Sequence, residues 1–546
     1  MRLTELKLPL DHTAEDLRAE IIRRLRIAPD ELLAYTIYRR SFDARKASAI
    51  VLTYTLDVEL KNESAVLTSL QGEPHVGPTP DTGYHFVTPA PAVSAVPAVP
   101  PALRPIVIGT GPCGLFAGLI LAQMGLRPLI LDRGKAVRER TKDTWGFWRQ
   151  GQLNPESNVQ FGEGGAGTFS DGKLYSQVRD PAYRSRKVLT EFVKAGAPEE
   201  ILYVAKPHIG TFRLVSMVEN MRASILALGG EIRFQSRVDD VHIDDGKIHG
   251  ITLTNGESSE YIAADHVVLA IGHSARDTFE MLHRRGVHME PKAFSIGVRI
   301  EHPQSLIDAA RFGKNAGHPI LGAADYKLVH HCRNQRSAYS FCMCPGGTVV
   351  AAASEPGRVV TNGMSQYSRN ERNANSAIVV GVSPADYPAR YPGDPLAGVE
   401  FQRHWETLAF AAGGSDYRAP AQRLGDFLAG RPSTALGSVL PSYTPGIHLT
   451  DLSACLPDYV TQALREALPA FNRAIKGFAL DDALLTGIET RTSSPLRITR
   501  DENFHSLAVH GLFPAGEGAG YAGGILSAAI DGIKVAEAVA LSLSGH

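Results

Sequence analysis

The sequence predicts an α/β protein in three parts. A parallel-sheet domain is interrupted by a long inserted α+β domain and preceded by a small α+β domain of βαββ type. Three observations predict this arrangement. A strand, glycine turn, helix and second strand run from 106 to 134. A Pro- and Ala-rich stretch separates them from the first part of the chain, and another apolar strand followed by glycines appears near the end.

The segment from 106 to 134 has the pattern of a dinucleotide-binding unit. An apolar run leads into Gly109-x-Gly111-x-x-Gly114, then helix formers and a second apolar run that ends in Asp132. Gly109 permits a tight turn, and Gly111 lets the backbone approach a pyrophosphate at the N-terminus of the helix. Asp132 lies near the roughly 20-residue spacing of the acid that binds a ribose hydroxyl. A glycine-rich turn in a core is the alternative, and the motif alone does not separate FAD from NAD.

Length and composition limit the number of domains, the class of partner and the cellular location that the sequence predicts. The 546 residues predict two to four domains, and 56 basic against 57 acidic residues argue neither for nor against a polyanionic partner. No apolar stretch is long enough to cross a bilayer, and the start, MRLTELKLPLDH, lacks the apolar region of a signal peptide. Five scattered cysteines are too few for a disulfide framework. We therefore expect a cytoplasmic protein without a membrane partner.

The domain boundaries follow from the one conspicuous linker. The segment 88–105, TPAPAVSAVPAVPPALRP, is too rich in Pro and Ala to form a regular core element, so we expect an extended tether. The predicted division is a small domain over 1–87, the linker, the first part of the dinucleotide domain over 106–275, an inserted substrate domain over 276–480, and the closing part over 481–546.

The N-terminal segment predicts a small ferredoxin-like domain. Leu6, Leu8 and Leu10 alternate as in a strand, and Thr13 with Asp16 three residues later resembles a helix capping box. A second clean alternation runs over 52–60, as expected for a half-buried strand. The order of these signals is that of a βαββ unit.

This N-terminal domain also carries gathered cations. They are Arg23, Arg24, Arg26, Arg39, Arg40, Arg45 and Lys46. One interpretation is a surface for RNA or another anionic partner, because phosphate contacts need clustered positive charge. The other is a solvated helix face and a basic hairpin balanced by nearby acids, and the absence of an aromatic RNA-stacking motif favours this second interpretation.

A second glycine-rich segment, NVQFGEGGAGTFSDGKL, follows over 158–174. Gly164 and Gly165 leave backbone N–H groups uncovered, which suits a phosphate or the polar edge of a flavin, although a flexible loop is the alternative. Next come an amphipathic helix over 214–228 and the run EIRFQSRVDDVHIDDGKIHGITLTNGE, which predicts a three-stranded meander. The chain then returns through a buried strand to a glycine turn at Gly272.

The order of these elements resembles the FAD domain of the flavoprotein group that contains glutathione reductase and fumarate reductase. The closing segment, GLFPAGEGAGYAGGILSAAIDGIKVAEAVA over 511–540, resembles the last flavin motif of that group. The resemblance implies that Glu517 holds the ribityl chain and that a helix beginning near Gly523, Gly524 and Ile525 points its N-terminus at the flavin. A positive helix terminus would stabilise negative charge on reduced flavin. The resemblance implies a Rossmann-type FAD-binding domain.

Shorter strings resemble one family within that group, the FAD-dependent dehydrogenases of bacteria and plastids. They are FGEGGAGTFSDGKL, KPHIGT, FSIGVRIEHPQ, CMCPGG and GIETRTSSPLRITRD, and with the N-terminal domain they cover nearly the whole chain. The resemblance implies a fold and a cofactor but no substrate. Asp132 stands where Glu is commoner and Glu517 where Asp is commoner, which changes the reach of each carboxylate by one methylene.

The predicted cofactor is FAD. The residues expected to bind it are Gly109, Gly111, Gly114, Asp132, Arg133, Gly164, Gly165, Val238, Gly272, Gly516, Glu517, Gly523, Gly524 and Ile525. No second GxGxxG opens a strand–helix unit elsewhere. NAD(P)H, if it is used, would therefore bind only transiently as an electron donor.

Candidate catalytic residues come from two segments. Arg491 is expected to contact an anion or a flavin carbonyl, with Ser493 and Ser494 as hydrogen-bond donors; a salt-bridged strand between domains is the alternative. His208 is a candidate for proton transfer because its ordinary pKa lies near neutrality, although a lone histidine is more often structural. Lys173 is a candidate for anion binding.

The pair Cys342 and Cys344 invites a redox interpretation. The neighbouring apolar residues instead favour a buried strand whose cysteines pack as small hydrophobic side chains. Four metal ligands are not visible around the pair, and no metal is predicted.

Two classes of function are open. The first is an FAD-dependent oxidoreductase that transfers a hydride to or from a small organic substrate, bound between the insert and the flavin. The second is a flavoprotein whose N-terminal domain docks RNA or a protein, so that the flavin serves modification or sensing. A flavin monooxygenase is a third option, chemically close to the first. The oligomeric state is left open.

Overall fold

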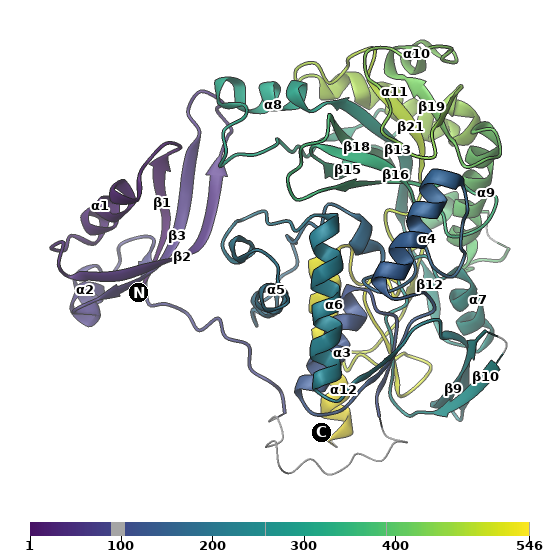
Figure 1. Cartoon of the computed structure of the whole chain (residues 1–546), viewed down its shortest axis with the longest axis horizontal. Helices are drawn as coiled ribbons and strands as arrows, with labels where there is room; N and C mark the ends of the chain where they lie inside the picture. The colour runs from purple at the N-terminus through teal and green to yellow at the C-terminus, as the bar shows by residue number, and fades with distance from the viewer. Residues whose placement is uncertain (89–103, 257, 389, 545–546) are drawn as a thin grey trace.

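The computed structural model describes residues 1–88, 104–256, 258–388 and 390–544 (Figure 1). Residues 89–103, most of the predicted linker, lie outside the described residues. The described chain forms a small N-terminal domain, a parallel sheet with its helices, and a larger mixed sheet that enters between two strands of the parallel sheet. The predicted α/β fold class is confirmed.

The parallel sheet brings together segments far apart in the sequence. Its order is β23-β11-β5-β6-β7, and all neighbours pair in parallel. The strands are β5 (Ile106–Ile108), β6 (Leu129–Leu131), β7 (Glu231–Arg233), β11 (Val267–Leu269) and β23 (Leu512–Pro514). The residues of β5, β6, β11 and β23 are all buried, because helices and further strands cover both faces, and this explains their short apolar runs.

Helices packed on this sheet position the glycine segments. They include α3 (Pro112–Gln123), α4 (Val137–Gln150), α5 (Arg184–Lys194), α6 (Thr211–Ala227) and α12 (Ile525–Leu543). In Figure 1, α6, α3 and α12 run side by side. A Cβ at Gly532 of α12 would lie 2.2 Å from the Cys113 carbonyl oxygen of α3, so glycine permits their close approach. Among the described residues, no helix combines the length and apolar character needed to cross a bilayer.

The predicted meander forms, with one change. Its strands are β8 (Arg237–Asp244), β9 (Lys247–Asn255) and β10 (Ser258–Ala263), in the order β10-β9-β8. Asp245 and Gly246 both have positive φ in the turn between β8 and β9, as the sequence predicts for a tight hairpin. The start of the run, however, is β7 of the parallel sheet, because three residues of mixed polarity give no period that assigns them to either sheet.

The insert is built on a seven-stranded mixed sheet. Its order is β14-β15-β18-β13-β21-β19-β20. The strands are β13 (Phe294–Pro303), β14 (Val329–His331), β15 (Ser337–Cys344), β18 (Asn373–Val382), β19 (Ala419–Arg423), β20 (Ile447–Leu449) and β21 (Leu484–Glu489). Two small antiparallel pairs flank it: β12 (Met289–Pro291) with β22 (Leu496–Ile498), and β16 (Gly347–Ala351) with β17 (Thr361–Ser365).

Helices cover this insert. They are α8 (Gln304–Phe312), α9 (Ala397–Ala412), α10 (Leu424–Ala429) and α11 (Asp458–Phe471). Helix α7 (Arg276–Arg284) instead packs on β8 of the meander. Short 3-10 helices punctuate the chain: η2 (Ala166–Phe169), η3 (Glu199–Leu202), η4 (Gly313–Asn315), η5 (Pro384–Asp386) and η6 (Leu452–Cys455). In Figure 1 strands β15 and β18 of the seven-stranded sheet lie above helices α6, α3 and α12 of the parallel-sheet domain.

The N-terminal domain is ferredoxin-like. It contains β1 (Arg2–Pro9), α1 (Ala14–Leu25), β2 (Leu32–Asp43), β3 (Val51–Leu60), α2 (Glu63–Ser69) and β4 (Val76–Gly77), with sheet order β2-β3-β1-β4. The predicted capping box between Thr13 and Asp16 forms. The predicted βαββ order was incomplete: α2 and β4 make it βαββαβ, because the two residues of β4 are too few to show an alternation.

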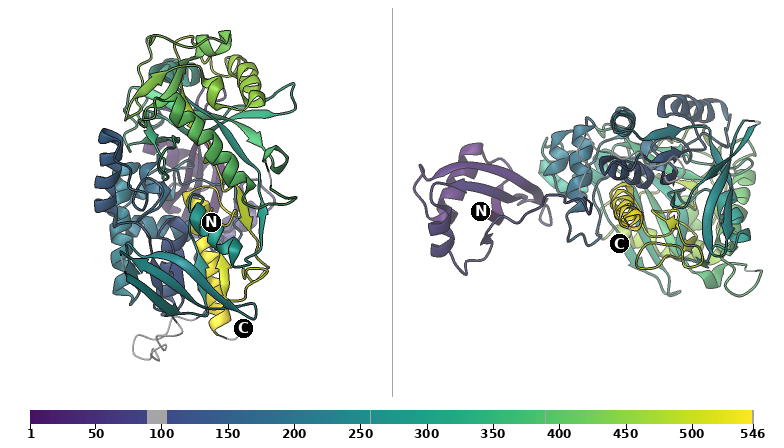
Figure 2. Two further views of the ribbon diagram at one scale, coloured as in Figure 1. Left: turned by 90° about the vertical axis from the view of Figure 1, so that its right-hand side faces the viewer. Right: turned by 90° about the horizontal axis from the view of Figure 1, so that it is seen from below.

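The N-terminal domain projects from one side of the body but touches both larger parts (Figure 2). Arg40 of β2 exchanges backbone hydrogen bonds with Tyr203 and Ala205, at 2.6 and 2.9 Å. Phe42 stacks edge-on against Phe312 of α8, with ring centroids 5.9 Å apart. The domain therefore lies against the parallel-sheet domain and the insert together.

Candidate functional site

The first glycine turn leaves the N-terminus of α3 open. Gly109 has a φ of +106°, and a Cβ there would lie 2.3 Å from the Ala270 carbonyl oxygen, so only glycine fits. A Cβ on Gly114 would lie 1.9 Å from the Gly109 oxygen. Within the described residues, no side chain caps α3 at Gly111, and a Cβ there would meet only the Cα of Gly165, at 3.7 Å. The first N–H groups of α3 are thus free to bind an anion.

The second glycine loop lies directly on the first. Gly164 and Gly165 have φ values of +87° and +61°. The Gly164 N–H donates to the Thr110 carbonyl at 2.9 Å, and a Cβ on Gly165 would lie 2.8 Å from the Gly111 Cα. The two segments that the sequence assigned to the dinucleotide are therefore in contact.

The closing motif completes the site. Helix α12 begins at Ile525 with Gly524 as its N-cap residue, as expected from the sequence. A Cβ on Gly167 of the second loop would lie 3.0 Å from Ile525 Cγ1, so the two segments touch. At Gly523 a Cβ would meet no described atom within 4 Å, whereas at Gly516 it would lie 2.9 Å from the Cys113 Cβ. Three glycine-bearing segments thus meet at one place.

Asp132 stabilises the first glycine turn by hydrogen bonds. Its carboxylate accepts hydrogen bonds from the Thr110 N–H (2.9 Å), the Thr110 hydroxyl and the Gly134 N–H (2.8 Å). A carboxylate offers about four lone-pair sites, so these three donors leave about one for a ribose hydroxyl. Asp132 therefore holds the first turn through three hydrogen bonds and keeps about one acceptor position for the cofactor. The aspartate side chain is one methylene shorter than that of glutamate, and its carboxylate therefore stays close to the turn.

The remaining predicted cofactor residues lie around the same turns. Arg133 is bound by Glu156 and Asp277, each at 2.8 Å, so its guanidinium joins two segments. Val238 is buried in the core under the meander and offers only its backbone for hydrogen bonding. Gly272 packs beside the closing motif, where a Cβ on Gly518 would lie 2.6 Å from the Gly272 oxygen.

This donor set fits FAD. Glycines with left-handed backbone bring the turns together, and space remains at Gly111 and Gly523 where side chains would otherwise stand. The open N–H groups of α3 suit a pyrophosphate, and the N-terminus of α12 suits the negative charge that reduced flavin carries. Glu517 follows Gly516 between these two helix ends, where the sequence placed the ribityl contact.

A lysine that the sequence analysis missed lies beside Glu517. Lys292, at the start of the insert, donates from Nζ to the Ser493 hydroxyl at 2.7 Å. Burial raises the pKa of Glu517 to about 7, and the positive charge of Lys292 opposes this shift. Burial also lowers the pKa of Lys292. Lys292 belongs to no recognisable motif in its local sequence, PKAFS over 291–295, and only the fold brings it close to Ser493 and Glu517.

The raised pKa of Glu517 predicts a stability that depends on pH. An acid whose pKa is raised by folding stabilises the fold fully below its ordinary pKa of 4.5 and loses that contribution as the pH rises through about 7. The difference corresponds to about 3 kcal/mol. In protein stripped of FAD, we expect wild type and Glu517→Gln to melt together near pH 4.5, and wild type to melt lower than the variant above pH 7. Parallel melting curves at all pH values would contradict this.

Lys173 and His208 lie next to each other. They form an isolated antiparallel bridge, and Lys173 Nζ donates to the Met343 carbonyl while lying 3.5 Å from the Asp171 carboxylate. His208 Nε2 lies 3.0 Å from the Tyr367 carbonyl. Burial is the main cause of the lowered pKa of His208, so its ring is neutral at pH 7. The two sequence candidates thus lie together, and Lys173 contacts the 342–344 turn of the insert through the Met343 carbonyl.

That turn presents Cys342 differently from what the sequence predicts. Cys342 is exposed, whereas Cys344 is buried. A bulge in β15 gives Cys342 a φ of +43°, and Arg299 donates to its carbonyl at 2.8 Å. The expectation of two cysteines packed as small hydrophobic side chains is correct for Cys344 and wrong for Cys342, because the bulge turns that side chain out of the strand.

Native thiol labelling tests this placement. All five cysteines are described, and Cys342 alone among them is exposed. We expect N-ethylmaleimide to add once to the native protein, at Cys342, as measured by intact mass. The addition should be slow at pH 7 and faster as the pH rises, because desolvation by the surrounding residues raises the pKa of this thiol to about 12. Cys342→Ser is expected to abolish the addition and Cys344→Ser to keep it. Labelling of native Cys342→Ser at the same rate would contradict the structure.

Arg491 is held in a buried ion cluster. Its guanidinium pairs with Glu406 at 3.1 Å and donates to the hydroxyls of Ser274 and Ser354. Arg276 binds the same carboxylate at 2.7 Å. This is the salt-bridged arrangement that the sequence left open as the alternative for Arg491. Ser494 is also buried, and its hydroxyl donates to the Gly518 carbonyl at 3.2 Å.

The chain resembles a known protein over nearly its whole length. The chain is 48% identical over 538 residues to an uncharacterized protein of Clostridium beijerinckii, and the match covers 98% of both chains. The chain belongs to the same family. A family model described as "FAD-dependent protein, C-terminal domain-like" matches residues 293–492, and a domain of unknown function matches 1–59. Residues 293–492 therefore match a domain described for FAD-dependent proteins, which supports the cofactor that the glycine segments predict.

Solved flavoproteins are more distant from this family. The flavin-dependent brominase Bmp2 is 13% identical with a TM-score of 0.37, and the match covers 81% of this chain and 80% of that one. Glycerol-3-phosphate dehydrogenase from Bacillus halodurans, in complex with FAD, is 13% identical with a TM-score of 0.35, covering 81% and 64%. Values this low carry no conclusion about the reaction.

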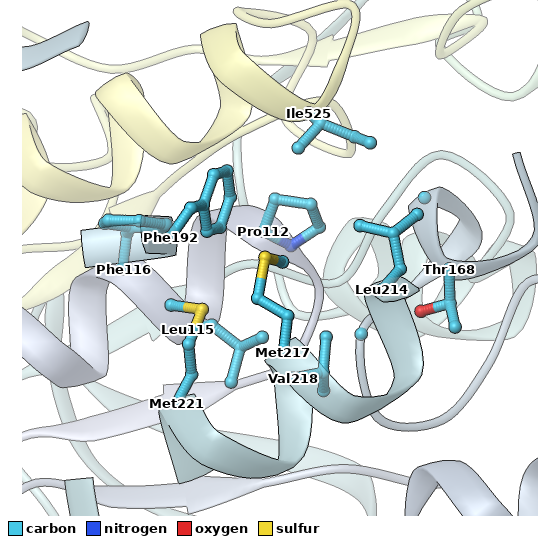
Figure 3. A pocket seen from close by; sticks show the side chains of 12 residues that line it. Pro112, Leu115, Phe116, Thr168, Phe192, Leu214, Met217, Val218, Met221 and Ile525 are labelled. Atoms are coloured by element: carbon cyan, nitrogen blue, oxygen red, sulfur yellow. The ribbon is translucent and has the colours of Figure 1, made fainter. Parts of the chain in front are cut away.

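A small apolar pocket lies beside the glycine segments (Figure 3). Its lining is Pro112, Leu115, Phe116, Gly164, Gly167, Thr168, Phe192, Leu214, Met217, Val218, Met221 and Ile525. Thr168 alone contributes a polar side chain, and its buried hydroxyl has no hydrogen-bond partner among the described residues. The pocket suits an apolar group and lies between α3 and α6, next to the second glycine loop.

Three of the seven cations in the basic cluster of the N-terminal domain form ion pairs. Arg23 binds Glu20 at 2.5 Å, Arg26 binds Glu73 at 2.7 Å and Arg45 binds Asp43 at 2.5 Å. These pairs lie at the surface, where each contributes little to stability but reduces the local positive charge. Arg24, Arg39, Arg40 and Lys46 form no ion pair with the described residues, so both interpretations of the cluster stay open.

Proposed function

We propose that this FAD-dependent protein is an oxidoreductase, a dehydrogenase or reductase, that exchanges a hydride with a small organic substrate held between the insert and the glycine segments. One observation carries the proposal: Lys173 and His208 pair with each other beside the second glycine loop, and both contact the insert, Lys173 at the Met343 carbonyl and His208 at the Tyr367 carbonyl. Bound FAD supplies the hydride acceptor or donor. The protein must then orient the substrate and move its proton.

His208 suits the role of the proton acceptor. Because the Tyr367 carbonyl can only accept, a neutral His208 ring carries its proton on Nε2. Its Nδ1 is then an acceptor, and within the described residues no hydrogen bond occupies it. A neutral imidazole that faces the substrate takes the proton released as the hydride leaves.

Lys173 suits the role of the group that orients the substrate. Its ammonium is held by Asp171 and the Met343 carbonyl, and Arg369 binds the same Asp171 at 2.5 Å. The second cation reduces the negative charge of Asp171, so Lys173 keeps an attraction for an anionic group or a carbonyl oxygen. A small organic acid or carbonyl compound is the substrate class that this arrangement favours.

The test is the flavin spectrum under anaerobic conditions. NADH, NADPH and a panel of small hydroxy and amino acids are each added to the yellow protein, and bleaching near the flavin band is followed. Bleaching by an organic donor supports a dehydrogenase, and bleaching by a pyridine nucleotide moves the search to organic acceptors. Failure of every donor, together with failure of organic acceptors to reoxidise the photoreduced protein, would overturn the proposal. Substrate-dependent oxygen uptake would instead indicate a monooxygenase.

With the donor or acceptor identified in this way, His208→Asn is expected to lower the rate at pH 7 by about 10²–10⁴-fold. His249→Asn, on an exposed face of β9, is the matched control and should leave the rate unchanged. An unchanged rate in His208→Asn would remove the histidine from the mechanism while leaving the oxidoreductase activity established.

A further inference from the structure

A compact group of metal-ligating side chains lies on the insert, at the end of β15 away from Cys342. His330 is on the edge strand β14, Cys332 follows it, and Glu466 is on α11. His330 Nε2 lies 3.1 Å from Glu466 Oε1. One ligand atom from each of the three residues lies within 4.8 Å of the other two. His330 and Glu466 are 136 positions apart in the chain, so only the fold brings them together.

The three atoms match the preferences of Zn²⁺. Zn²⁺ binds imidazole nitrogen, thiolate sulfur and carboxylate oxygen at about 2.0–2.3 Å, whereas Mg²⁺ and Ca²⁺ prefer sites made of oxygen alone. Ligand atoms around a tetrahedral ion at those distances lie about 3.3–3.8 Å apart. Since the ligand atoms lie within 4.8 Å of one another, the group needs to close by at most about one ångström, which side-chain rotation provides.

The surrounding contacts fix the ligands in place. The Arg333 N–H donates to both carboxylate oxygens of Glu466, each at 3.2 Å, and so orients the carboxylate. Asn334 Nδ2 donates to the Tyr459 carbonyl at 3.0 Å, which ties the β14–β15 hairpin to α11. Cys332 is buried, so its thiol is protected on the inner side of the group while His330 and Glu466 reach the surface.

We propose that His330, Cys332 and Glu466 bind one Zn²⁺, with a water molecule in the fourth position, and that the ion ties the edge of the seven-stranded sheet to α11. Binding displaces the thiol proton of Cys332 and breaks the direct His330–Glu466 hydrogen bond in exchange for two metal bonds. The proposal concerns the outer side of the insert and does not depend on the reaction at the flavin.

The test measures metal content of the FAD-loaded protein. Samples are equilibrated with a small excess of Zn²⁺, freed of unbound metal and analysed by mass spectrometry for zinc and by absorbance for FAD. We expect about one Zn²⁺ per chain in wild type and a loss of most of it in His330→Ala and Cys332→Ser. His331→Ala is the matched control, because this neighbouring ring contacts Ser337 instead, and it should keep the zinc.

A second measurement guards against a folding defect in Cys332→Ser. Difference spectra with Co²⁺ in place of Zn²⁺ are expected to show a sulfur-to-metal charge-transfer band in wild type and in His331→Ala, and none in Cys332→Ser that retains FAD. His330 is half-exposed, so His330→Ala gives an independent answer. Zinc content at background in wild type, or zinc content equal in wild type, His330→Ala and Cys332→Ser, would overturn the proposal.

Discussion

Replacing Glu406 by glutamine is expected to lower the free energy of unfolding by about 3–5 kcal/mol, because it removes the carboxylate that two buried guanidinium groups share. Arg491 then has no ion-pair partner among the described residues, and Arg276 keeps only Glu355. Glu406 is fully buried and binds Arg276 at 2.7 Å and Arg491 at 3.1 Å. Burial alone would raise the pKa of Glu406, but these two arginines hold it well below its usual range. The cluster joins α7, α9 and the segment after β21, so its loss should loosen the insert from the FAD domain.

Denaturant unfolding followed by flavin fluorescence and circular dichroism measures this effect. Glu400→Gln, on the same helix, is the matched control: Glu400 pairs with Arg403 at 2.8 Å but is 39% exposed, so its removal should cost at most about 1 kcal/mol. In Glu406→Gln we expect the midpoint measured by flavin fluorescence to fall at a lower denaturant concentration than the midpoint measured by circular dichroism, because FAD is released before the helices unfold. Equal midpoints for the two variants would show that the buried cluster does not hold the domains together.

Gly111→Ala is expected to weaken FAD binding at least tenfold, about 1.4 kcal/mol, while leaving the fold intact. Gly111 has an ordinary negative φ and a Cβ there would meet only the Gly165 Cα, at 3.7 Å, so the protein itself accepts alanine. The added methyl would instead occupy the space through which a pyrophosphate approaches the N-terminus of α3. A loss of FAD without a loss of helix content therefore reports directly on the cofactor.

Two further glycine variants make this interpretation specific. Gly109→Ala introduces a Cβ 2.3 Å from the Ala270 oxygen at a φ of +106°, so it should damage both the fold and FAD binding. Gly146→Ala adds a methyl in α4 where no described atom lies within 4 Å, and it should change neither. Dissociation constants come from quenching of FAD fluorescence during titration. Wild-type affinity in Gly111→Ala would place the dinucleotide elsewhere.

The sequence was sufficient to predict the FAD elements, because their signals are local. A turn that needs positive φ, as at Gly109 and Gly164, favours glycine at that residue, so the sequence shows where the turn lies. Short buried strands of a parallel sheet are apolar throughout and can be recognised in the same way. The start of α12 at Ile525 follows from the same kind of signal, a pair of glycines before a helical run.

The rest of the site could not be predicted, because it depends on contacts between distant segments. Lys292 and Ser493 are separated by 201 positions, and Arg491 and Glu406 by 85. The sequence around each of these four residues contains no pattern that indicates its partner. Cys342 is exposed because a bulge interrupts β15, and the apolar residues around it gave the opposite prediction. Periodicity describes a regular strand and does not show where the strand stops being regular.

The central claim is that the three glycine segments form an FAD site, and the FAD content of the purified protein tests it most directly. Absorbance of the native protein and of the flavin released on denaturation gives the stoichiometry and the identity of the cofactor. We predict a yellow protein with one FAD per chain, which can be stripped and reconstituted. A colourless protein that takes up no FAD would contradict the account.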